Sequence, residues 1–365
     1  MKNSFGNSIV ITLFGESHGD YIGAVLDGLA PGIKINEEYI SVKLLQRRPS
    51  GSISTARVEA DEYSIVSGVF NGYTTGAPLC ILIPNTNKKS ADYGEAMDIP
   101  RPGHADYTAR VKYHGFEDHR GGGHFSGRVT AAIVAAGAIL GSALHDKGIK
   151  IGSHITELHG AFDRPFDDIE ADIDYVNNKQ FPTLTDSAES SMIKEIEKAK
   201  SLGDSVGGIL ESAIIGLPAG VGEPWFDSME SMLSHALFSI PAVKGVEFGL
   251  GFAFADVYGS EGNDEFSVQG GRVVTDTNNN GGINGGITNG MPITFRTVIK
   301  PTPTIFREQA SVSLAKMENT SIKNSGRHDP AIIHRARAVV DAMAAIVVAD
   351  MLTVRYGTDY LATKE

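Results

Sequence analysis

The chain has 365 residues, of which 41% are hydrophobic and 21% are charged, so it can bury a sizeable core and is not a disordered polyelectrolyte. Its formal net charge of −12 at pH 7 argues against general nucleic-acid binding, because neutralising phosphates requires a basic face. The single cysteine, Cys80, excludes an intrachain disulfide and a thiolate metal cluster, and it favours a reducing, intracellular environment.

Hydrophobic periodicity and the positions of glycine, proline and asparagine predict the following elements. In chain order they are a strand at residues 9–13, a helix at 37–46 capped by Asn36, strands at 63–70 and 79–83, a helix at 126–144, a strand at 150–155, a helix at 190–202, a strand at 206–215, a helix at 228–238, strands at 243–248 and 292–298, and a helix at 330–354.

The order of these elements shows no regular alternation of strand and helix, which favours an α+β fold over a doubly wound sheet. The helices at 126–144 and 330–354 have little polar face, so each must be covered nearly all round. We expect them at the centre of a single large domain spanning residues 1–365, since no linker rich in proline, serine or charge divides the chain. The acidic segment 162–186 is expected to form a surface excursion.

Neither the N-terminal segment nor the apolar run 129–144 predicts contact with a membrane. The N-terminal segment has one early lysine and only a short apolar run before Glu16 and His18, which does not fit a secretory signal. The apolar run 129–144 is shorter than the roughly 20 residues that a span needs, and the spacing of Gly137 and Gly141 within it indicates close helix packing rather than membrane dimerisation. We therefore expect a cytoplasmic protein.

Five segments place ionisable residues beside glycine or proline, and each alone is compatible with a structural role. They are FGESHG (14–19), QRRPSG (46–51), RPGHADY (101–107), DHRGGGHFSGR (118–128) and GRHDP (326–330). Arginines lie in or beside these segments at positions 47, 48, 101, 120, 128, 327, 335 and 337. If the segments converge, the resulting pocket is positive, and because guanidinium groups suit carboxylate and phosphate, the implied ligand is a small polyanion. The helix that begins at Ser126 would add an N-terminus that favours negative charge.

A metal site is the alternative interpretation of the same region. Potential ligands lie close together in sequence, namely His104, Asp106, His114, Asp118, His119 and His124. Against a metal, the sequence contains no HExxH pair, and the neighbouring arginines would repel a divalent cation. We expect no catalytic metal.

Taken together, the segments resemble the chorismate synthase family, and they follow that family's order over nearly the whole chain. The resemblance rests on FGESHG, RRPSG, SGVFNGYTTGAPL, RPGHADYT, RGGGHFSGRVTAAIVAAGAI, LGDSVGG, GLPAGVGEPWFD, SIPAVKGVEFG, NNNGGINGGITNG, KPTPTI and GRHDP with the apolar helix after it.

The resemblance implies a β-α-β sandwich with central helices between antiparallel sheets, assembled as a homotetramer. It implies a lyase of the shikimate pathway of aromatic amino-acid biosynthesis, a carbon–oxygen lyase that acts on a phosphate. The reaction is a 1,4-anti elimination of phosphate and the C6 hydrogen from 5-enolpyruvylshikimate-3-phosphate to give chorismate. The implied cofactor is reduced FMN, without net redox change. The electrons would come from NADPH or from a separate flavin reductase.

The resemblance also assigns roles to residues. His18 would protonate the departing phosphate, His104 would protonate the reduced flavin, and Asp329 would act with the flavin in removing the C6 proton. Anionic groups of the substrate would be bound by Arg47, Arg48, Arg101, Arg128 and Arg327. Flavin contacts would come from His124, Phe125, Ser126, Pro241, Ala242, Gly285, Lys300, Pro301, Thr302, Pro303, Thr304 and Arg327.

Two departures from the family pattern concern the binding residues. After the glycines the commoner pattern is Arg-Ser-Ser-Ala-Arg, whereas this chain has His124, Phe125, Ser126, Gly127 and Arg128. We expect His124 to contact FMN through a ring nitrogen and Phe125 to pack inward. Many relatives also carry an arginine shortly after the arginine pair, where this chain reaches Arg57 only later.

Two other function classes remain open from sequence. A flavin-dependent oxidoreductase acting on an anionic substrate would use the same pocket, although no GxGxxG follows a strand to provide a dinucleotide site. A non-catalytic phosphometabolite-binding protein would keep the arginines, but binding alone would not need His18, His104 and Asp329 together.

Overall fold

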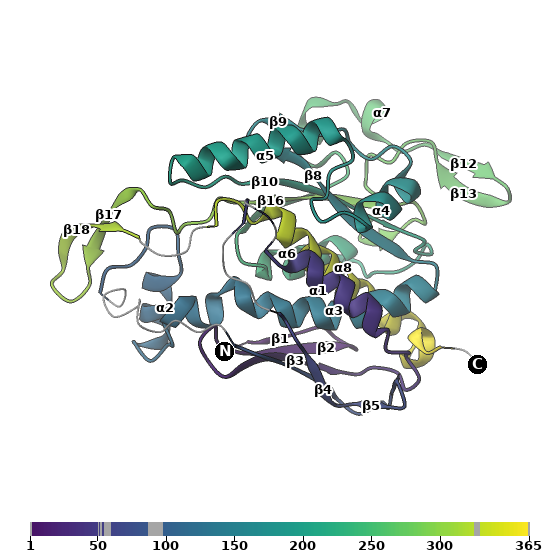
Figure 1. Ribbon diagram of the computed structural model, residues 1–365. Coiled ribbons are helices and arrows are strands. Elements are labelled where there is room, and N and C mark those ends of the chain that lie inside the picture. The colour runs from purple at the N-terminus through teal and green to yellow at the C-terminus, as the bar shows by residue number, and fades with distance from the viewer. Residues whose placement is uncertain are drawn as a thin grey trace.

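The computed structural model describes residues 2–49, 51, 53–54, 60–86, 98–324 and 329–363. Two five-stranded antiparallel sheets enclose a layer of helices (Figure 1). The first sheet comes mainly from the N-terminal quarter of the chain, in the order β1 (Ser4–Phe5), β2 (Val10–Gly15), β3 (Tyr21–Asp27), β7 (Leu79–Pro84) and β4 (Ser64–Ser67).

The second sheet has one face toward the central helices and the other toward an outer helix. Its order is β11 (Val243–Phe248), β16 (Ile293–Ile299), β10 (Gly208–Ile215), β8 (Lys150–Leu158) and β9 (Ala161–Phe162). Successive residues of β8 point to opposite faces. Ser153 donates to Asp341 of a central helix at 2.5 Å, whereas a Cβ at Gly152 would lie 3.0 Å from Ile173 in the outer layer.

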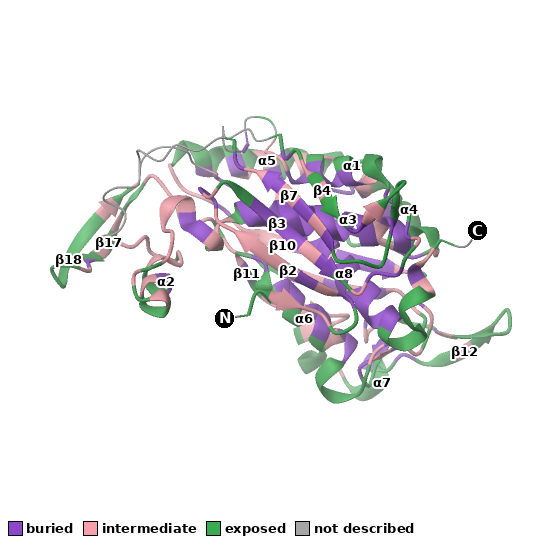
Figure 2. Cartoon of the chain, turned by 90° about the horizontal axis from the view of Figure 1, so that it is seen from below, coloured by how far each residue is buried: buried purple, intermediate pink, exposed green. Residues whose placement is uncertain are grey.

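The central layer contains α1 (Glu37–Arg47), α3 (Thr130–Asp146), α6 (Met229–Ser239) and α8 (Ile333–Tyr356). Residues 130–140 of α3 and 336–353 of α8 are all buried, as the sequence predicted (Figure 2). The two helices approach closely, because a Cβ at Gly137 would lie 2.5 Å from the Cβ of Ala342. The segment Gly127–Asp146 is long and apolar enough to span a membrane, but 89% of its apolar window is buried here, so it is a core helix.

The segment 162–186 is not the surface excursion that its acidic composition predicted. It contains α4 (Ile169–Asn177), whose Ile173 and Val176 are fully buried against the second sheet. Its acidic residues are partly neutralised within the segment, since Arg164 binds both carboxylate oxygens of Asp172 at 2.6 and 2.7 Å. Together with α5 (Asp186–Ser201), α4 forms an outer helical layer (Figure 1).

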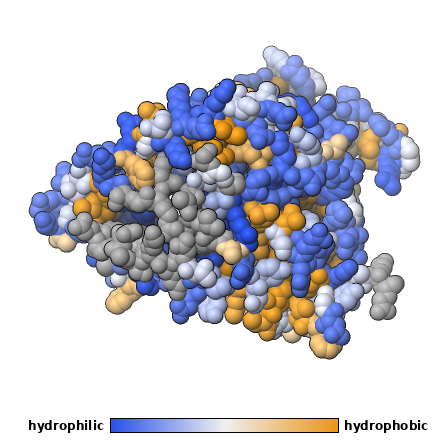
Figure 3. Space-filling model, viewed as in Figure 1, coloured by the Kyte–Doolittle hydropathy of each residue, from blue (hydrophilic) through white to orange (hydrophobic). Residues whose placement is uncertain are grey.

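The remaining elements lie around this sandwich. Two hairpins project from it (Figure 1), and hydrophilic residues make up most of the coloured surface in Figure 3. The hairpins are β12–β13 (Phe266–Gln269, Arg272–Thr275) and β17–β18 (Glu308–Ser313, Glu318–Lys323), and the shorter elements are β5 (Val69–Phe70), β6 (Tyr73–Thr74), α2 (Asp106–Tyr113), η2 (Arg120–Phe125), η3 (Gly127–Val129), η4 (Trp225–Asp227), η5 (Gly251–Asp256), α7 (Gly259–Gly262), β14 (Ile283–Asn284), β15 (Ile287–Thr288) and η6 (Thr358–Leu361).

The predicted α+β sandwich is confirmed, with the helices between antiparallel sheets. Every predicted strand and helix occurs within a few residues of its expected position, and Asn36 caps α1 by accepting from the Tyr39 amide at 3.0 Å. Among the elements that the sequence did not predict are β3, α2, α4 and the hairpins β12–β13 and β17–β18.

Candidate active site

The three glycines after Arg120 form a turn that only glycine adopts readily. Gly121, Gly122 and Gly123, here called the glycine turn, have φ values of 61°, 84° and 55°. A Cβ at Gly121 would lie 2.3 Å from Cε1 of His18, and a Cβ at Gly122 would lie 3.4 Å from Cε1 of His104. The absence of side chains therefore lets the turn pass between the two histidines that the sequence singled out.

His18 follows the end of β2 and is 95% buried, with 5% of its surface exposed. Backbone and side-chain bonds fix the segment that carries it. The amide of Ser17 donates to the carbonyl of Gly123 at 3.0 Å. Asn85, just after β7, donates to the carbonyls of Glu16 and Gly19, each at 2.9 Å. The histidine is thus held by the glycine turn on one side and by Asn85 on the other.

His104 is oriented by Asp106, the first residue of α2. Its Nδ1 lies 2.5 Å from Oδ1 of Asp106, so Nδ1–H donates, and Nε2 lies 3.3 Å from Nη2 of Arg101. Arg101 binds the same carboxylate through Nε and Nη2, each at 2.8 Å. Burial raises the pKa of Asp106, but hydrogen bonds from Arg101 and His104 outweigh burial and leave the pKa well below its usual value. Asp106 is therefore an anion that orders both neighbours.

Asp61 gathers three of the predicted anion-binding arginines. Its side chain is fully buried and binds Arg47 at 2.7 Å, binds Arg128, and lies 4.0 Å from Nε of Arg48. These residues are called the Asp61 cluster below. Burial raises the pKa of Asp61, but Arg47 and Arg128 outweigh burial and hold the pKa below its usual value. Among the described residues, Nε of Arg47 and of Arg48 are buried and have no hydrogen-bond acceptor.

Arg335, near the start of α8, connects the Asp61 cluster to Asp329. Its Nη1 lies 2.5 Å from Oδ2 of Asp329, and its Nε donates to the carbonyl of Arg47 at 2.9 Å. Among the described residues, Arg47, Arg48, Arg128 and Arg335 thus lie within 4.0 Å of the carboxylates of Asp61 and Asp329. This region carries an excess of positive charge, which favours an anionic ligand.

Residues 300–304, the Lys300 loop, join both ends of the site. Lys300 donates through its amide to the carbonyl of Ala242 at 2.9 Å, and through Nζ to the carbonyl of Gly103 at 2.6 Å. Thr302 donates to the carbonyl of Asp329 at 2.6 Å, and Thr304 accepts from Arg101 at 3.2 Å. The predicted flavin segments 241–242 and 300–304 therefore lie beside the predicted catalytic residues.

These contacts form one closed series. It runs from the Lys300 loop through Asp329, Arg335 and the Asp61 cluster to Asn85 and the turn of His18, then across the glycine turn to His104, Asp106 and Arg101, and back to the Lys300 loop. Nearly all the segments that the sequence singled out are thus gathered at one place.

The residues after the glycine turn differ from expectation in one respect. Nδ1 of His124 donates to the carbonyl of Gly15 at 2.8 Å, which leaves Nε2 for a ligand. Ser126 caps the next turn by accepting from the amide of Arg128 at 3.3 Å. Phe125 does not pack inward, because 38% of its surface is exposed and its ring meets Tyr113 edge-on at 6.0 Å. The edge of Tyr113 on α2 offers it a partner outside the core.

Some predicted residues are not gathered with the rest. Gly285 lies near the N-terminus of α6, because the amide of Met229 donates to the carbonyl of the adjacent Gly286. Ala242, in contrast, follows the C-terminus of that helix. The helix is about 16 Å long, so Gly285 is remote from the Lys300 loop in this chain. Arg120 pairs with Asp118 near the surface, and Arg337 is in the core. Arg327 and Arg57 lie outside the described residues.

Sequence reasoning missed Asp61 and Asn85 and considered Asp106 only as a metal ligand. No motif spacing indicates that Asp61 would sit among arginines, because its partners are far apart in sequence. The described part of the chain contains no group of three or more His, Cys, Asp or Glu side chains placed to hold a metal.

The fold and this cluster define an enzyme with a positively charged site for a small anion. A family model for chorismate synthase matches residues 9–353. The chorismate synthase of Thermococcus gammatolerans is 47% identical over 95% of this chain and 96% of its own length, and that of Dehalococcoides mccartyi strain BAV1 is 45% identical over 96% of each. A crystal structure of chorismate synthase superposes with a TM-score of 0.75 at 29% identity, over 98% of this chain and 95% of that one. This chain belongs to the chorismate synthase family and is therefore a lyase.

Proposed function

We propose that the chain converts 5-enolpyruvylshikimate-3-phosphate into chorismate and phosphate by 1,4-anti elimination, with reduced FMN. The observation that carries the proposal is the closed series of contacts around the glycine turn. It brings two histidines, the arginines of the Asp61 cluster and a carboxylate together in one site. Binding alone would require only the arginines.

The Asp61 cluster would bind the phosphate and carboxylates of the substrate. Arg48 is its most accessible arginine, with 33% of its side chain exposed, so it would be the direct anion ligand. Arg47 and Arg128 are held by Asp61, so they supply positive charge in fixed positions. A preorganised charge of this kind stabilises the departing phosphate without reorganising during the reaction.

His18 and His104 would handle protons on either side of the glycine turn. His18, buried beside the turn, donates a proton to the leaving phosphate, while His104 holds a proton toward the flavin through Nε2. Asp329 would accept the C6 proton with the flavin. Its ion pair with Arg335 favours the carboxylate form that a base requires.

The residues near the Lys300 loop fit a flavin phosphate and ring. Lys300 places an ammonium group beside Gly103, and the adjacent Ala242 adopts φ = 77°, an unusual conformation for a residue with a side chain. When bound, reduced FMN supplies electron density that assists loss of phosphate. Pro241, Ala242, Lys300 to Thr304, His124 and Ser126 would hold it, while the remote position of Gly285 argues against a contact from the same chain.

The decisive experiment is an anaerobic assay with chemically reduced FMN and 5-enolpyruvylshikimate-3-phosphate. We expect equimolar phosphate and chorismate. Phosphate without chorismate, or neither product, would refute the proposal. Net oxidation of the flavin during turnover would favour the oxidoreductase alternative instead.

The same proposal covers the setting of the enzyme. We propose a cytoplasmic homotetramer in aromatic amino-acid biosynthesis, supplied with reduced flavin by NADPH-dependent reduction on the enzyme or by a separate reductase. Adding NADPH and oxidised FMN in place of reduced FMN distinguishes the two sources of electrons, since only an intrinsic reductase supports turnover of the purified protein under those conditions.

A further inference from the structure

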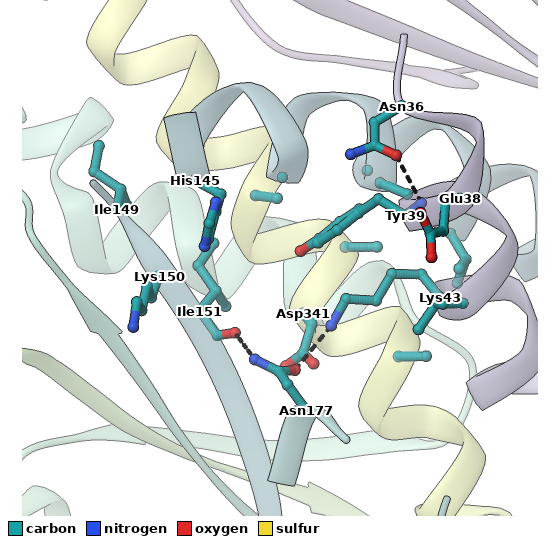
Figure 4. A pocket seen from close by; sticks show the side chains of 18 of the residues that line it. Asn36, Glu38, Tyr39, Lys43, His145, Ile149, Lys150, Ile151, Asn177 and Asp341 are labelled. Carbon is teal, nitrogen blue, oxygen red and sulfur yellow. Dashed lines mark hydrogen bonds between the residues drawn. The ribbon is translucent and has the colours of Figure 1, made fainter. Parts of the chain in front are cut away.

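A cavity of about 390 Å³ lies between α1, α3, α8, α4 and the start of β8 (Figure 4). Its lining, as far as the structure describes it, includes none of the residues assigned to the proposed active site, where the second cavity described measures only about 30 Å³. A volume of this size is within the range of about 300–1,000 Å³ that is typical of small-molecule sites. The volume alone does not identify a ligand, so the class of ligand is inferred from the residues that line the cavity.

One wall of the cavity is apolar because small residues line the helices there. It is lined by Ala138 and Gly141 of α3 and by Ala342 and Ala345 of α8. The ring of Tyr39 also lines the cavity (Figure 4). A Cβ at Gly141 would come within 3.4 Å of the Tyr39 hydroxyl oxygen. Because an apolar cavity of about 150 Å³ can hold a benzene ring, this wall can accommodate an apolar group of that size.

The opposite end of the cavity is strongly polar and buried. Nζ of Lys43 donates to Oδ1 of Asn177 at 2.8 Å, and Nη1 of Arg337 donates to the same oxygen at 3.3 Å. Nη1 of Arg337 also lies 3.7 Å from Oδ2 of Asp341. Lys43, Arg337 and Asp341 are 7%, 0% and 5% exposed. Two cations thus meet one carboxylate, which leaves one buried positive charge without a counter-charge in this group. The other Lys, Asp and Glu residues of the lining lie outside it, since Glu38 is exposed and Lys150 pairs with Asp174 at 2.7 Å.

Two polar groups at this end lack full partners. Asp341 accepts from Ser153 through Oδ1 at 2.5 Å, but its buried Oδ2 has no hydrogen-bond donor among the described residues. Burial lowers the pKa of Lys43 to about 8, which shows the cost of an ammonium group in this place. Figure 4 shows Lys43 and Asp341 at the same end of the cavity, beside Asn177. An anion next to Lys43 and a donor next to Asp341 would satisfy both groups.

We infer that this cavity binds a small 2-hydroxycarboxylate with an apolar body. The carboxylate pairs with Lys43, the hydroxyl donates to the carboxylate of Asp341, and the apolar body lies on the wall of small residues. A single negative charge matches the single excess positive charge, whereas a phosphate dianion would leave the group negative and a neutral molecule would leave it positive. The inference does not depend on the reaction proposed above.

Calorimetric titration with three related probes tests each part of this assignment. Mandelate carries the carboxylate, the hydroxyl and a phenyl ring. Phenylacetate lacks the hydroxyl, and mandelamide lacks the charge. We expect one mandelate per chain and at least tenfold weaker binding of each analogue, the change that about 1.4 kcal/mol produces. Equal binding of mandelate and mandelamide, or no binding of mandelate, would overturn the assignment.

Variants then locate the bound mandelate. Lys43→Met keeps the side-chain length and removes a buried charge, so the fold should survive, as circular dichroism and thermal unfolding can verify. We expect at least tenfold weaker mandelate binding, whereas Lys194→Met, at an exposed position on α5, should bind as the unaltered protein does. Unchanged binding by a folded Lys43→Met, or displacement of mandelate by 5-enolpyruvylshikimate-3-phosphate, would place the anion elsewhere and contradict the inference. The titrations need no flavin and no turnover, so they stay informative if the proposed reaction is wrong.

Discussion

At the scale of single residues, Asp106 determines which nitrogen of His104 can reach a ligand. The carboxylate accepts a hydrogen bond from Nδ1–H of His104 at 2.5 Å and also binds Arg101. In Asp106→Asn the amide can present either an acceptor or a donor to the ring, so His104 would lose its fixed tautomer. We expect turnover to fall by about 10²-fold, within the range for general acid–base groups, with KM changed much less.

Steady-state assays over a range of pH measure this effect. Asp174→Asn, which alters an exposed carboxylate paired with Lys150, serves as the control and should leave turnover unchanged. If Asp106→Asn raises KM and leaves kcat intact, Asp106 acts on substrate binding through Arg101 rather than on His104.

Asp61 gives the second prediction, which concerns stability. Burial raises the pKa of Asp61, but Arg47 and Arg128 outweigh burial and lower this pKa below its usual value. The carboxylate therefore stabilises the fold above the unfolded-state pKa of about 4, and this stabilisation is lost as the pH falls below that value. Asp61→Asn leaves buried arginines uncompensated. We expect it to lower the free energy of unfolding by about 3–5 kcal/mol at pH 7, and by progressively less below pH 4.

Urea unfolding at several pH values can follow this difference. Glu170→Gln removes a partner of Lys150 from an exposed ion pair and should cost no more than about 1 kcal/mol at any pH. A loss for Asp61→Asn that is constant from pH 7 to pH 3 would mean that the cost comes from packing rather than from charge.

At the scale of elements, the glycine turn is a spacer between two histidines. In Gly121→Ala the new Cβ would overlap His18, at 2.3 Å from Cε1, so the ring must move. Gly115→Ala is a matched control, because its φ of 80° imposes the same backbone strain while nothing lies within 4 Å of its Cβ. Both variants should lose about 1–3 kcal/mol of stability. Only Gly121→Ala should lose activity, by about 10²-fold or more, and equal activities would separate His18 from the reaction.

The elements also show which parts of the fold were readable from sequence. Periodicity located α1, α3, α5, α6 and α8, because each has a continuous apolar stripe or an apolar surface all round. It missed α4, because the acidic residues around Ile173 and Val176 suggest an exposed segment. Only the folded chain shows that Arg164 neutralises Asp172 and that Ile173 and Val176 are buried. It missed β3, where Gly23 and Ala24 interrupt the larger apolar residues, although both lie in the buried centre of the first sheet.

The residues of the site could be predicted from the sequence only where a local motif marks them. His18, His104 and the arginines stand beside glycine or proline in short segments, so the segments could be recognised and expected to meet. Asp61 and Asn85 have no such local signal, and their importance comes from partners 14 to 69 residues away in the chain. Which arginines reach the ligand and which are held by carboxylates is a property of the folded chain.

At the scale of the whole molecule, α3 and α8 pack against each other and against opposite sheets, and one core joins all layers. The chain is therefore expected to unfold as one domain. Differential scanning calorimetry should give a single transition, with a calorimetric enthalpy close to the van't Hoff enthalpy of the cooperative unit. Two separated transitions, one for each sheet, would show that the chain contains two domains.

The position of α8 near the end of the sequence has a consequence for biosynthesis. The apolar surface of α3, which ends at Asp146, is covered by a helix that begins only at Ile333. At about 5–20 residues per second, the ribosome needs roughly 10–40 s to make the intervening chain. During this time the face of α3 that α8 covers has no partner in the nascent chain, although α1 and the first sheet can already cover its other faces. We therefore expect this face to bind chaperones at the ribosome until synthesis is nearly finished.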